Sequence, residues 1–177
     1  MYTIADTPAH WQDTFNRLQQ QYAATLDEQQ QQWFANLLAD NTLVRELAQV
    51  WLGSEFVFDW CVREPGWLIE LLHTGAIGHS PDASTLLARW QAEQAAVQDE
   101  ASLMHALRRF RQYTMLHIIW RDITRRASTL DTTAALTALA DVCIQQAVAF
   151  LYPRLCAELG TPCSEQGTPQ SFLVLGM

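Results

Sequence analysis

Apolar side chains recur along this chain at intervals of three and four residues, the spacing that places them on one face of an α-helix. The first such series consists of Trp11, Phe15, Leu18 and Tyr22. Similar series follow one another to about residue 159, separated by short polar or glycine-containing breaks. Each apolar face must be buried against another helix, so the pattern predicts an all-α, multi-helix bundle of seven to nine helices.

Helix start and stop signals divide this pattern into separate elements. Asp27 and Ser54 stand where an N-cap is needed, immediately before an apolar series. Ser80 followed by Pro81 predicts a further helix start, because proline is well tolerated at the first helical position. Pro65 should end one short helix and begin the next.

The two longest helices are predicted over about residues 100–127 and 131–159, with a kink at Pro153 in the second. With the shorter helices they make up a predicted helical domain over residues 1–160. Residues 161–170 contain two Thr-Pro pairs and one glycine, a composition typical of a linker.

Charge and composition exclude several functions. The formal net charge is -8, which opposes non-specific nucleic-acid binding over the whole surface. All eleven basic residues are arginine. Without lysine the chain offers neither a P-loop lysine for phosphates nor a Schiff-base lysine for covalent catalysis. Arginine instead favours planar, bidentate pairing with carboxylates or phosphates.

Other signals point to a cytoplasmic protein. The start of the chain has neither a basic segment nor an apolar core typical of a signal peptide. No uninterrupted apolar run of about 18 residues predicts a membrane span. The four cysteines form no C-x-x-C pair, so zinc binding is not predicted and reduced thiols are expected: Cys61, Cys143, Cys156 and Cys163.

The most informative stretch is LRRFRQYTMLHIIWRDITRRA, residues 107–127, which carries more than half of the arginines. Arg121 ends a helical stripe that begins with Leu103 and Leu107, so its guanidinium should be buried and need a carboxylate or helix-end carbonyls as partners. Asp122 is one turn away from Arg125 and Arg126 and is predicted to pair with one of them. The candidate cluster comprises Arg108, Arg109, Arg111, Arg121, Asp122 and Arg125.

Two interpretations of this cluster remain open. In the first, the arginines tie neighbouring helices together through acids such as Glu55, Asp59 and Glu64. In the second, they form a docking surface for an anionic group or for another domain. Helical spacing alone does not choose between them.

No set of residues predicts a catalytic, cofactor-binding or metal-binding site. His73 and His79 are separated by a glycine-containing loop that matches no dedicated metal motif. His117 lies on the partly apolar stripe and is expected to be a hydrogen-bonded core residue. G-x-S-x-G, H-E-x-x-H and glycine-rich phosphate loops are absent from the sequence.

Three stretches, in this order, carry a resemblance to a known family: LAQVWLGSEFVFDWCVREPGWLIELL, LRRFRQYTMLHIIWRDI and LGTPCSEQGTPQSFLVLGM. From about residue 43 to its end, the chain resembles the amino-terminal region of the glutamine synthetase adenylyltransferase family. Its bifunctional members add AMP to a glutamine synthetase tyrosine and remove it by phosphorolysis. The resemblance implies that the parent enzyme uses Mg²⁺, ATP, ADP and phosphate, and that glutamine synthetase and PII signalling protein are its partners.

In this family, a run like FLVLGM is the first strand of a nucleotidyltransferase sheet, preceding a glycine-rich turn and magnesium-binding aspartates. The resemblance therefore assigns residues 171–177 to the first strand of a truncated nucleotidyltransferase domain, with Gly176 at the start of the turn. No catalytic or metal-binding residue of the family falls within this chain. Residues 171–177 are expected to be irregular, swapped or packed on a neighbour, since the pairing strands are missing.

Two hypotheses for function follow. The first is an amino-terminal, non-catalytic helical support for the deadenylylating half of that enzyme, abutting its own downstream catalytic domain, with no nucleic-acid or membrane partner. The second is a free-standing helical adaptor that binds a protein partner, supported by the acidic composition and the lack of a recognisable site.

Overall fold

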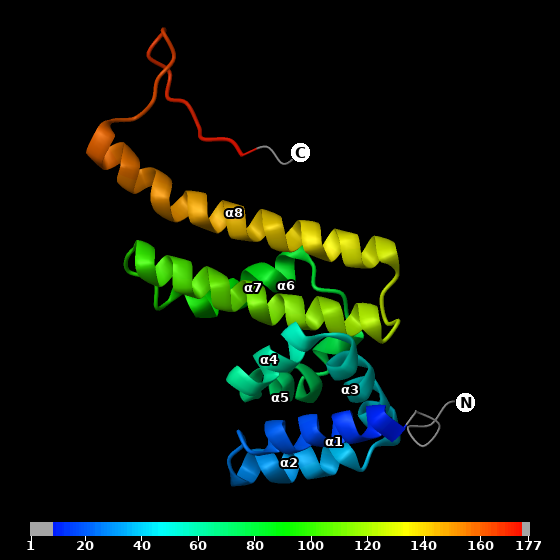
Figure 1. Ribbon diagram of the computed structural model, residues 1–177. Coiled ribbons are helices and arrows are strands. Elements are labelled where there is room, and N and C mark those ends of the chain that lie inside the picture. The colour runs from blue at the N-terminus through cyan, green and yellow to red at the C-terminus, as the bar shows by residue number, and fades with distance from the viewer. Residues whose placement is uncertain (1–8, 175–177) are drawn as a thin grey trace. The chain divides into compact units, whose positions relative to one another are not determined.

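The computed structural model describes residues 9–174, in which eight α-helices and one 3₁₀ helix follow one another without a strand (Figure 1). This confirms the predicted all-α class and number of helices. The bounds are α1 Ala9–Ala23, α2 Glu28–Leu38, α3 Asn41–Gly53, α4 Glu55–Arg63, α5 Pro65–His73, η2 Ala76–Gly78, α6 Ala83–Gln94, α7 Glu100–Ile123 and α8 Thr129–Leu159.

The predicted helix starts are confirmed at three of four positions. Asp27 caps α2 through a reciprocal pair of hydrogen bonds with Gln30, and the Ser54 hydroxyl accepts from the backbone of Val57 at the start of α4. Pro65 occupies the first turn of α5.

The predicted start at Ser80 and Pro81 is wrong, because Asp82 is the N-cap of α6. Its carboxylate accepts from the Thr85 N–H at 2.8 Å, while the Thr85 hydroxyl accepts from the Asp82 N–H at 3.0 Å. This reciprocal arrangement satisfies two orphan donors at once, which Ser80 cannot do from two residues earlier.

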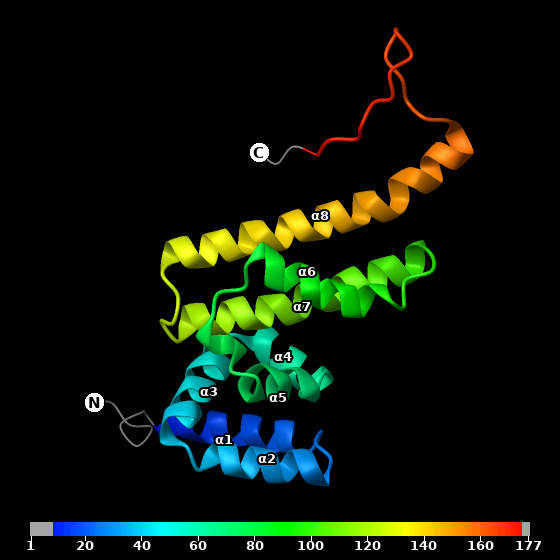
Figure 2. The same cartoon turned by 180° about the vertical axis from the view of Figure 1, so that it is seen from behind.

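The two long helices begin with the same device. Asp99 and Ser102 exchange backbone-to-side-chain hydrogen bonds at the start of α7, and Ser128 and Asp131 do so at the start of α8. α8 continues through Pro153, and Figure 2 shows the helix bending in its C-terminal part, drawn in orange. Proline removes one helical hydrogen bond and is a known cause of such bends.

The described helices belong to two compact units. The first contains residues up to 80 together with residues 112–133. Its core is built around the buried indole of Trp51, which has four aromatic neighbours: Phe15, Tyr22, Phe34 and Phe58. The Tyr22 hydroxyl donates to the Pro65 carbonyl at 3.0 Å, so this buried phenol is also satisfied.

The second unit contains residues 81–111 and the chain from residue 134 onward. Trp90 of α6 packs edge-on against Phe110 of α7, with ring centroids 5.6 Å apart. α8 buries Ala135, Leu139 and Val142 and leaves most of its other side chains exposed or half-buried.

Among the described helices, α8 is the one that is long and apolar enough to cross a membrane. The sequence pattern predicts no span, because no unbroken apolar run of about 18 residues occurs. These two properties do not distinguish a spanning helix from a long helix packed in a protein.

Beyond α8 the chain makes a narrow turn, in which Cys163 and Pro169 form an isolated antiparallel bridge. Residues 171–174 are irregular, as predicted, and the side chains of Phe172 and Leu173 are exposed. The strand pattern is thus not realised in these four residues, where the described chain offers no neighbouring strand. Gly176 lies outside the described residues, and the predicted division into residues 1–160, 161–170 and 171–177 stays a prediction.

We expect the free energy of unfolding to fall as the pH is lowered from about 5 to about 2. The pKa values of three cap carboxylates are depressed: that of Asp82 by the backbone N–H of Thr85, that of Asp99 by the Ser102 side chain, and that of Asp131 by the backbone N–H of Ser128. A carboxyl group whose pKa is lower in the folded state than in the unfolded state stabilises the fold at pH values above the unfolded-state pKa. This stabilisation is lost as the pH falls through the folded-state pKa.

The matched control replaces all three aspartates by asparagine, which still caps a helix but does not titrate. Urea unfolding of both proteins across this pH range should show a flatter profile for the variant. Parallel profiles would contradict the assigned caps.

Candidate functional site

The six candidate side chains of the arginine-rich helix are divided between the two compact units. Arg108, Arg109 and Arg111 belong to the second unit, whereas Arg121, Asp122 and Arg125 belong to the first. The sequence pattern places all six on one long helix, but the boundary between the units crosses that helix. Each group is therefore described separately.

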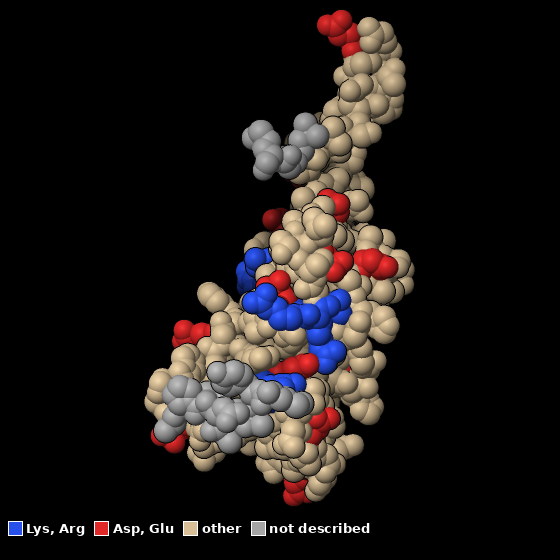
Figure 3. Space-filling model, turned by 90° about the vertical axis from the view of Figure 1, so that its right-hand side faces the viewer, with Lys and Arg blue, Asp and Glu red and all other residues tan. Residues whose placement is uncertain are grey.

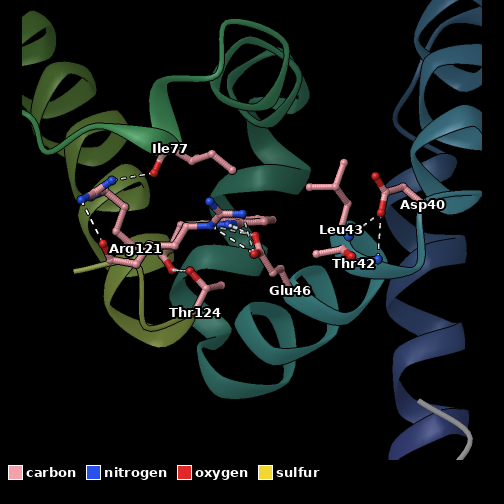
Figure 4. A network of polar contacts seen from close by, with 9 residues as sticks. Asp40, Thr42, Leu43, Glu46, Ile77, Arg121 and Thr124 are labelled. Carbon is pink, nitrogen blue, oxygen red and sulfur yellow. Dashed lines mark hydrogen bonds and ion pairs between the residues drawn. The ribbon is translucent and has the colours of Figure 1, made fainter. Parts of the chain in front are cut away.

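Arg121 is buried at the end of α7, as its position on the apolar stripe predicts. Its Nη1 donates to the carbonyl of Ile77 in η2 at 2.6 Å, and its Nη2 donates to the carbonyl of Arg126 at 3.1 Å (Figure 4). Burial lowers its pKa, opposed by the nearby Asp131 carboxylate and reinforced by the Arg126 charge. Of the two kinds of partner that were predicted, a carboxylate or helix-end carbonyls, the guanidinium binds carbonyls.

Glu46 of α3 is the main partner that the sequence pattern did not single out. Its buried carboxylate accepts from Nη2 of Arg126 at 2.7 Å and from Nε of the same guanidinium at 3.1 Å. The indole N–H of Trp120 also donates to it, at 3.2 Å. A glutamate one turn beyond Leu43 and one turn before Val50 lies on the buried face of its helix, and that spacing is the signal that could have identified it.

The end of α7 explains why these groups meet. The Arg126 N–H donates to the Arg121 carbonyl at 2.8 Å and the Arg125 N–H donates to the Asp122 carbonyl at 3.1 Å, which together form a Schellman motif. Arg125 takes the left-handed position, with φ of 59°, where glycine is usual. This turn ends the helix before residue 127 and directs the Arg126 side chain towards Glu46.

Asp122 does not pair with an arginine among the described residues, contrary to the prediction. Its carboxylate accepts from the hydroxyl of Thr132 at 3.0 Å, close to the start of α8. Asp122 therefore ties the two sides of the connection between α7 and α8, whereas the Arg126 guanidinium goes to the more buried Glu46.

The remaining candidates lie in the second unit. Arg109 is half-buried, with its Nε 3.9 Å from a carboxylate oxygen of Glu93, while Arg108 and Arg111 are exposed. Glu46 and Glu93 are thus two acids that lie beside these arginines, and Asp131 lies near Arg121. Pairing with the predicted acids, Glu55, Asp59 and Glu64, stays a prediction. Figure 3 shows basic side chains interleaved with acidic ones on the face it presents.

Two of the histidines lie close together in the first unit. His117 is buried and its Nε2 lies 3.1 Å from the carbonyl of His79, which confirms a hydrogen-bonded core residue. Within residues 9–174, no three His, Cys, Asp or Glu side chains converge as metal ligands would. The arginine–glutamate network joins the end of α7 to α3 and η2.

A family model described as glutamate-ammonia ligase adenylyltransferase matches residues 44–177. Three curated relatives carry the name bifunctional glutamine synthetase adenylyltransferase/adenylyl-removing enzyme. Identity is 40% over 131 residues with the Thioalkalivibrio sulfidiphilus protein, 39% over 135 with that of Pseudomonas aeruginosa and 41% over 134 with that of Pseudomonas putida. These alignments cover 74%, 76% and 75% of this chain. The chain spans 14% of the length of each relative.

We expect Arg121→Ala to destabilise the protein by about 3 kcal/mol and Arg126→Ala by about 1 kcal/mol. The first change leaves two carbonyls without a donor in a buried site. The second removes an exposed guanidinium, and Glu46 keeps the Trp120 N–H. Urea unfolding measures both, with Arg108→Ala as the exposed control. Equal losses for Arg121 and Arg126 would contradict the burial assigned to Arg121.

Arg125→Gly should stabilise the protein by about 0.5 kcal/mol, because glycine adopts the left-handed conformation without steric cost. Arg125→Ala, which also removes the charge but retains Cβ, is the matched control and should give no such gain. Thermal unfolding of the two variants makes the comparison. A glycine variant less stable than the alanine variant would argue against the Schellman turn.

Proposed function

The chain belongs to the glutamate-ammonia ligase adenylyltransferase family, and we propose that it is the amino-terminal helical segment of a bifunctional enzyme acting on glutamine synthetase. The match over residues 44–177, three quarters of the chain, carries this proposal. The names of the relatives support both activities: transfer of an adenylyl group to glutamine synthetase, and removal of an adenylyl group.

The proposed parent reaction of this half is phosphorolysis of the AMP–tyrosine bond, which gives ADP and unmodified glutamine synthetase. The other half transfers AMP from ATP, and both use Mg²⁺. Glutamine synthetase and PII signalling protein are the proposed partners of the enzyme. Its proposed compartment is the cytoplasm, and we propose no nucleic-acid or membrane partner. These assignments concern the whole enzyme. The chain itself spans 14% of the length of its relative from Thioalkalivibrio sulfidiphilus.

The chain's own proposed role is to support its downstream catalytic domain. Its described donor groups do not fit a Mg²⁺ site, which would need converging oxygen ligands. The guanidiniums near the end of α7 are likewise engaged by protein groups: the buried Arg121 by two carbonyls and the exposed Arg126 by Glu46. Both observations favour a scaffold over a site that handles phosphoryl groups.

The coding sequence beyond Met177 tests the identity of the parent. We expect an E-L-N segment followed by S-D-x-D-L within about thirty residues, the span of a strand–turn–helix unit. A stop codon at this point, together with a stable complex between the isolated chain and another protein, would instead establish the helical adaptor.

The isolated chain should not remove AMP from adenylylated glutamine synthetase. Release of ADP in the presence of phosphate and Mg²⁺ is the measurement, with the full-length enzyme as positive control. ADP released by the chain alone, above a blank without protein, would overturn its role as a non-catalytic support.

A further inference from the structure

The C-terminal end of α8 brings two cysteines close to one tyrosine. Tyr152 and Cys156 are four residues apart on the helix and therefore lie on the same face. The helix ends at Leu159, and Gly160 has φ of 90°, a left-handed conformation that reverses the direction of the chain. The residues that follow can thus fold back towards this face.

The turn that follows is held against Tyr152. Cys163 bridges to Pro169, and the Gln170 N–H donates to the Pro162 carbonyl at 2.8 Å, so both sides of the base of the turn are joined. The Tyr152 hydroxyl donates to the Gln170 carbonyl at this same base. Cys163 therefore lies at the end of the turn that Tyr152 fixes to α8.

The environment of the Tyr152 hydroxyl agrees with this placement. Its pKa is raised first by a hydrogen bond with the Cys156 side chain, then by burial, and then by the charges of Cys156 and Cys163. Both thiols thus lie near one phenol oxygen.

We propose that Cys156 and Cys163 are a redox modification site, which hydrogen peroxide converts into a reversible intrachain disulfide. Cys163 is exposed and its thiol donates to the Thr161 carbonyl at 3.4 Å, while Cys156 is half-buried one helical turn after Tyr152. Reaction with peroxide requires an accessible thiolate, so Cys163 is the residue attacked first.

The other two cysteines are poorer candidates. Cys61 is buried in the core of the first unit, and burial raises its pKa to about 12. Cys143 is half-buried on α8, and burial raises its pKa despite the nearby Arg111 charge. Raised pKa values leave less thiolate, so both thiols should react slowly.

The reaction balances in two steps. The Cys163 thiolate attacks one oxygen of hydrogen peroxide, the O–O bond breaks, and with one proton taken up the products are a sulfenic acid and water. The Cys156 thiolate then attacks the sulfenic sulfur, forming the S–S bond and displacing hydroxide, which is protonated to a second water. Two thiols are oxidised by two electrons and one peroxide is reduced to two waters.

The disulfide replaces a hydrogen-bonded tie with a covalent one. In the reduced protein, the Tyr152 hydroxyl holds the turn through the Gln170 carbonyl. In the oxidised protein, the turn is also linked to α8 through Cys156, which restricts the course of residues 171–174 that leave the turn. This proposal does not depend on the activity of the parent enzyme.

Trypsin digestion gives a direct test, because the chain has no lysine and Arg154 is its last arginine. The fragment from residue 155 to the end contains Cys156 and Cys163 and no other cysteine, and Cys61 and Cys143 fall in separate fragments. The folded chain is treated with peroxide, its remaining thiols are alkylated after denaturation, and the fragments are weighed. The fragment should lose the mass of two hydrogen atoms and escape alkylation, and dithiothreitol should reverse both changes.

Variants separate this pair from general thiol oxidation. Cys143→Ser should behave as the wild type, whereas Cys156→Ser and Cys163→Ser should each abolish the mass loss. Tyr152→Phe should slow disulfide formation several-fold, because the turn loses its hydrogen bond to α8. The proposal fails if the fragment is recovered doubly alkylated, if Cys143 pairs instead, or if the cross-link joins two chains. An unchanged rate for Tyr152→Phe would overturn the positioning role of the tyrosine.

Discussion

The buried guanidinium of Arg121 is the interaction on which the first unit most depends. A charged group out of contact with water is tolerated only when its donors are satisfied, and here the carbonyls of Ile77 and Arg126 accept from its two terminal nitrogens. These contacts join α7 to η2 and to the turn after the helix. The same turn places Arg126 on Glu46 of α3, so two guanidiniums fix three segments that lie far apart in the sequence.

Local chemistry made much of this fold predictable. Helix spacing and caps such as Asp27 and Ser54 act within one turn of the chain, so the number of helices and most of their starts follow from the sequence. The pattern of Ser80 and Pro81 predicts the start of α6 too early. Asp82 is the N-cap instead, because it forms reciprocal hydrogen bonds with Thr85. The burial of Arg121 was predictable from its stripe. The identity of its partners was not, because the Ile77 carbonyl is a backbone group brought there by tertiary packing.

The pairing of Glu46 in the candidate site likewise could not be predicted from local sequence. Its position among apolar residues of α3 marks it as buried, but its partner is eighty residues away in sequence. The pairing exists because a Schellman turn with Arg125 at its left-handed position directs Arg126 towards α3. The arginine-rich stretch is therefore a set of helix-end contacts in the first unit and a separate set in the second. The chain belongs to the glutamate-ammonia ligase adenylyltransferase family and spans 14% of the length of a longer relative.

The central claim is that the Arg121 guanidinium is buried and hydrogen-bonded to two backbone carbonyls. Because the chain contains no lysine, every basic side-chain signal in an ¹⁵N NMR spectrum belongs to an arginine, apart from histidine rings. The most direct measurement is the solvent-exchange rate of the guanidinium Nη protons at neutral pH. The Arg121 protons should exchange far more slowly than those of the exposed Arg108 and Arg111. Equally fast exchange for all three residues would contradict the account.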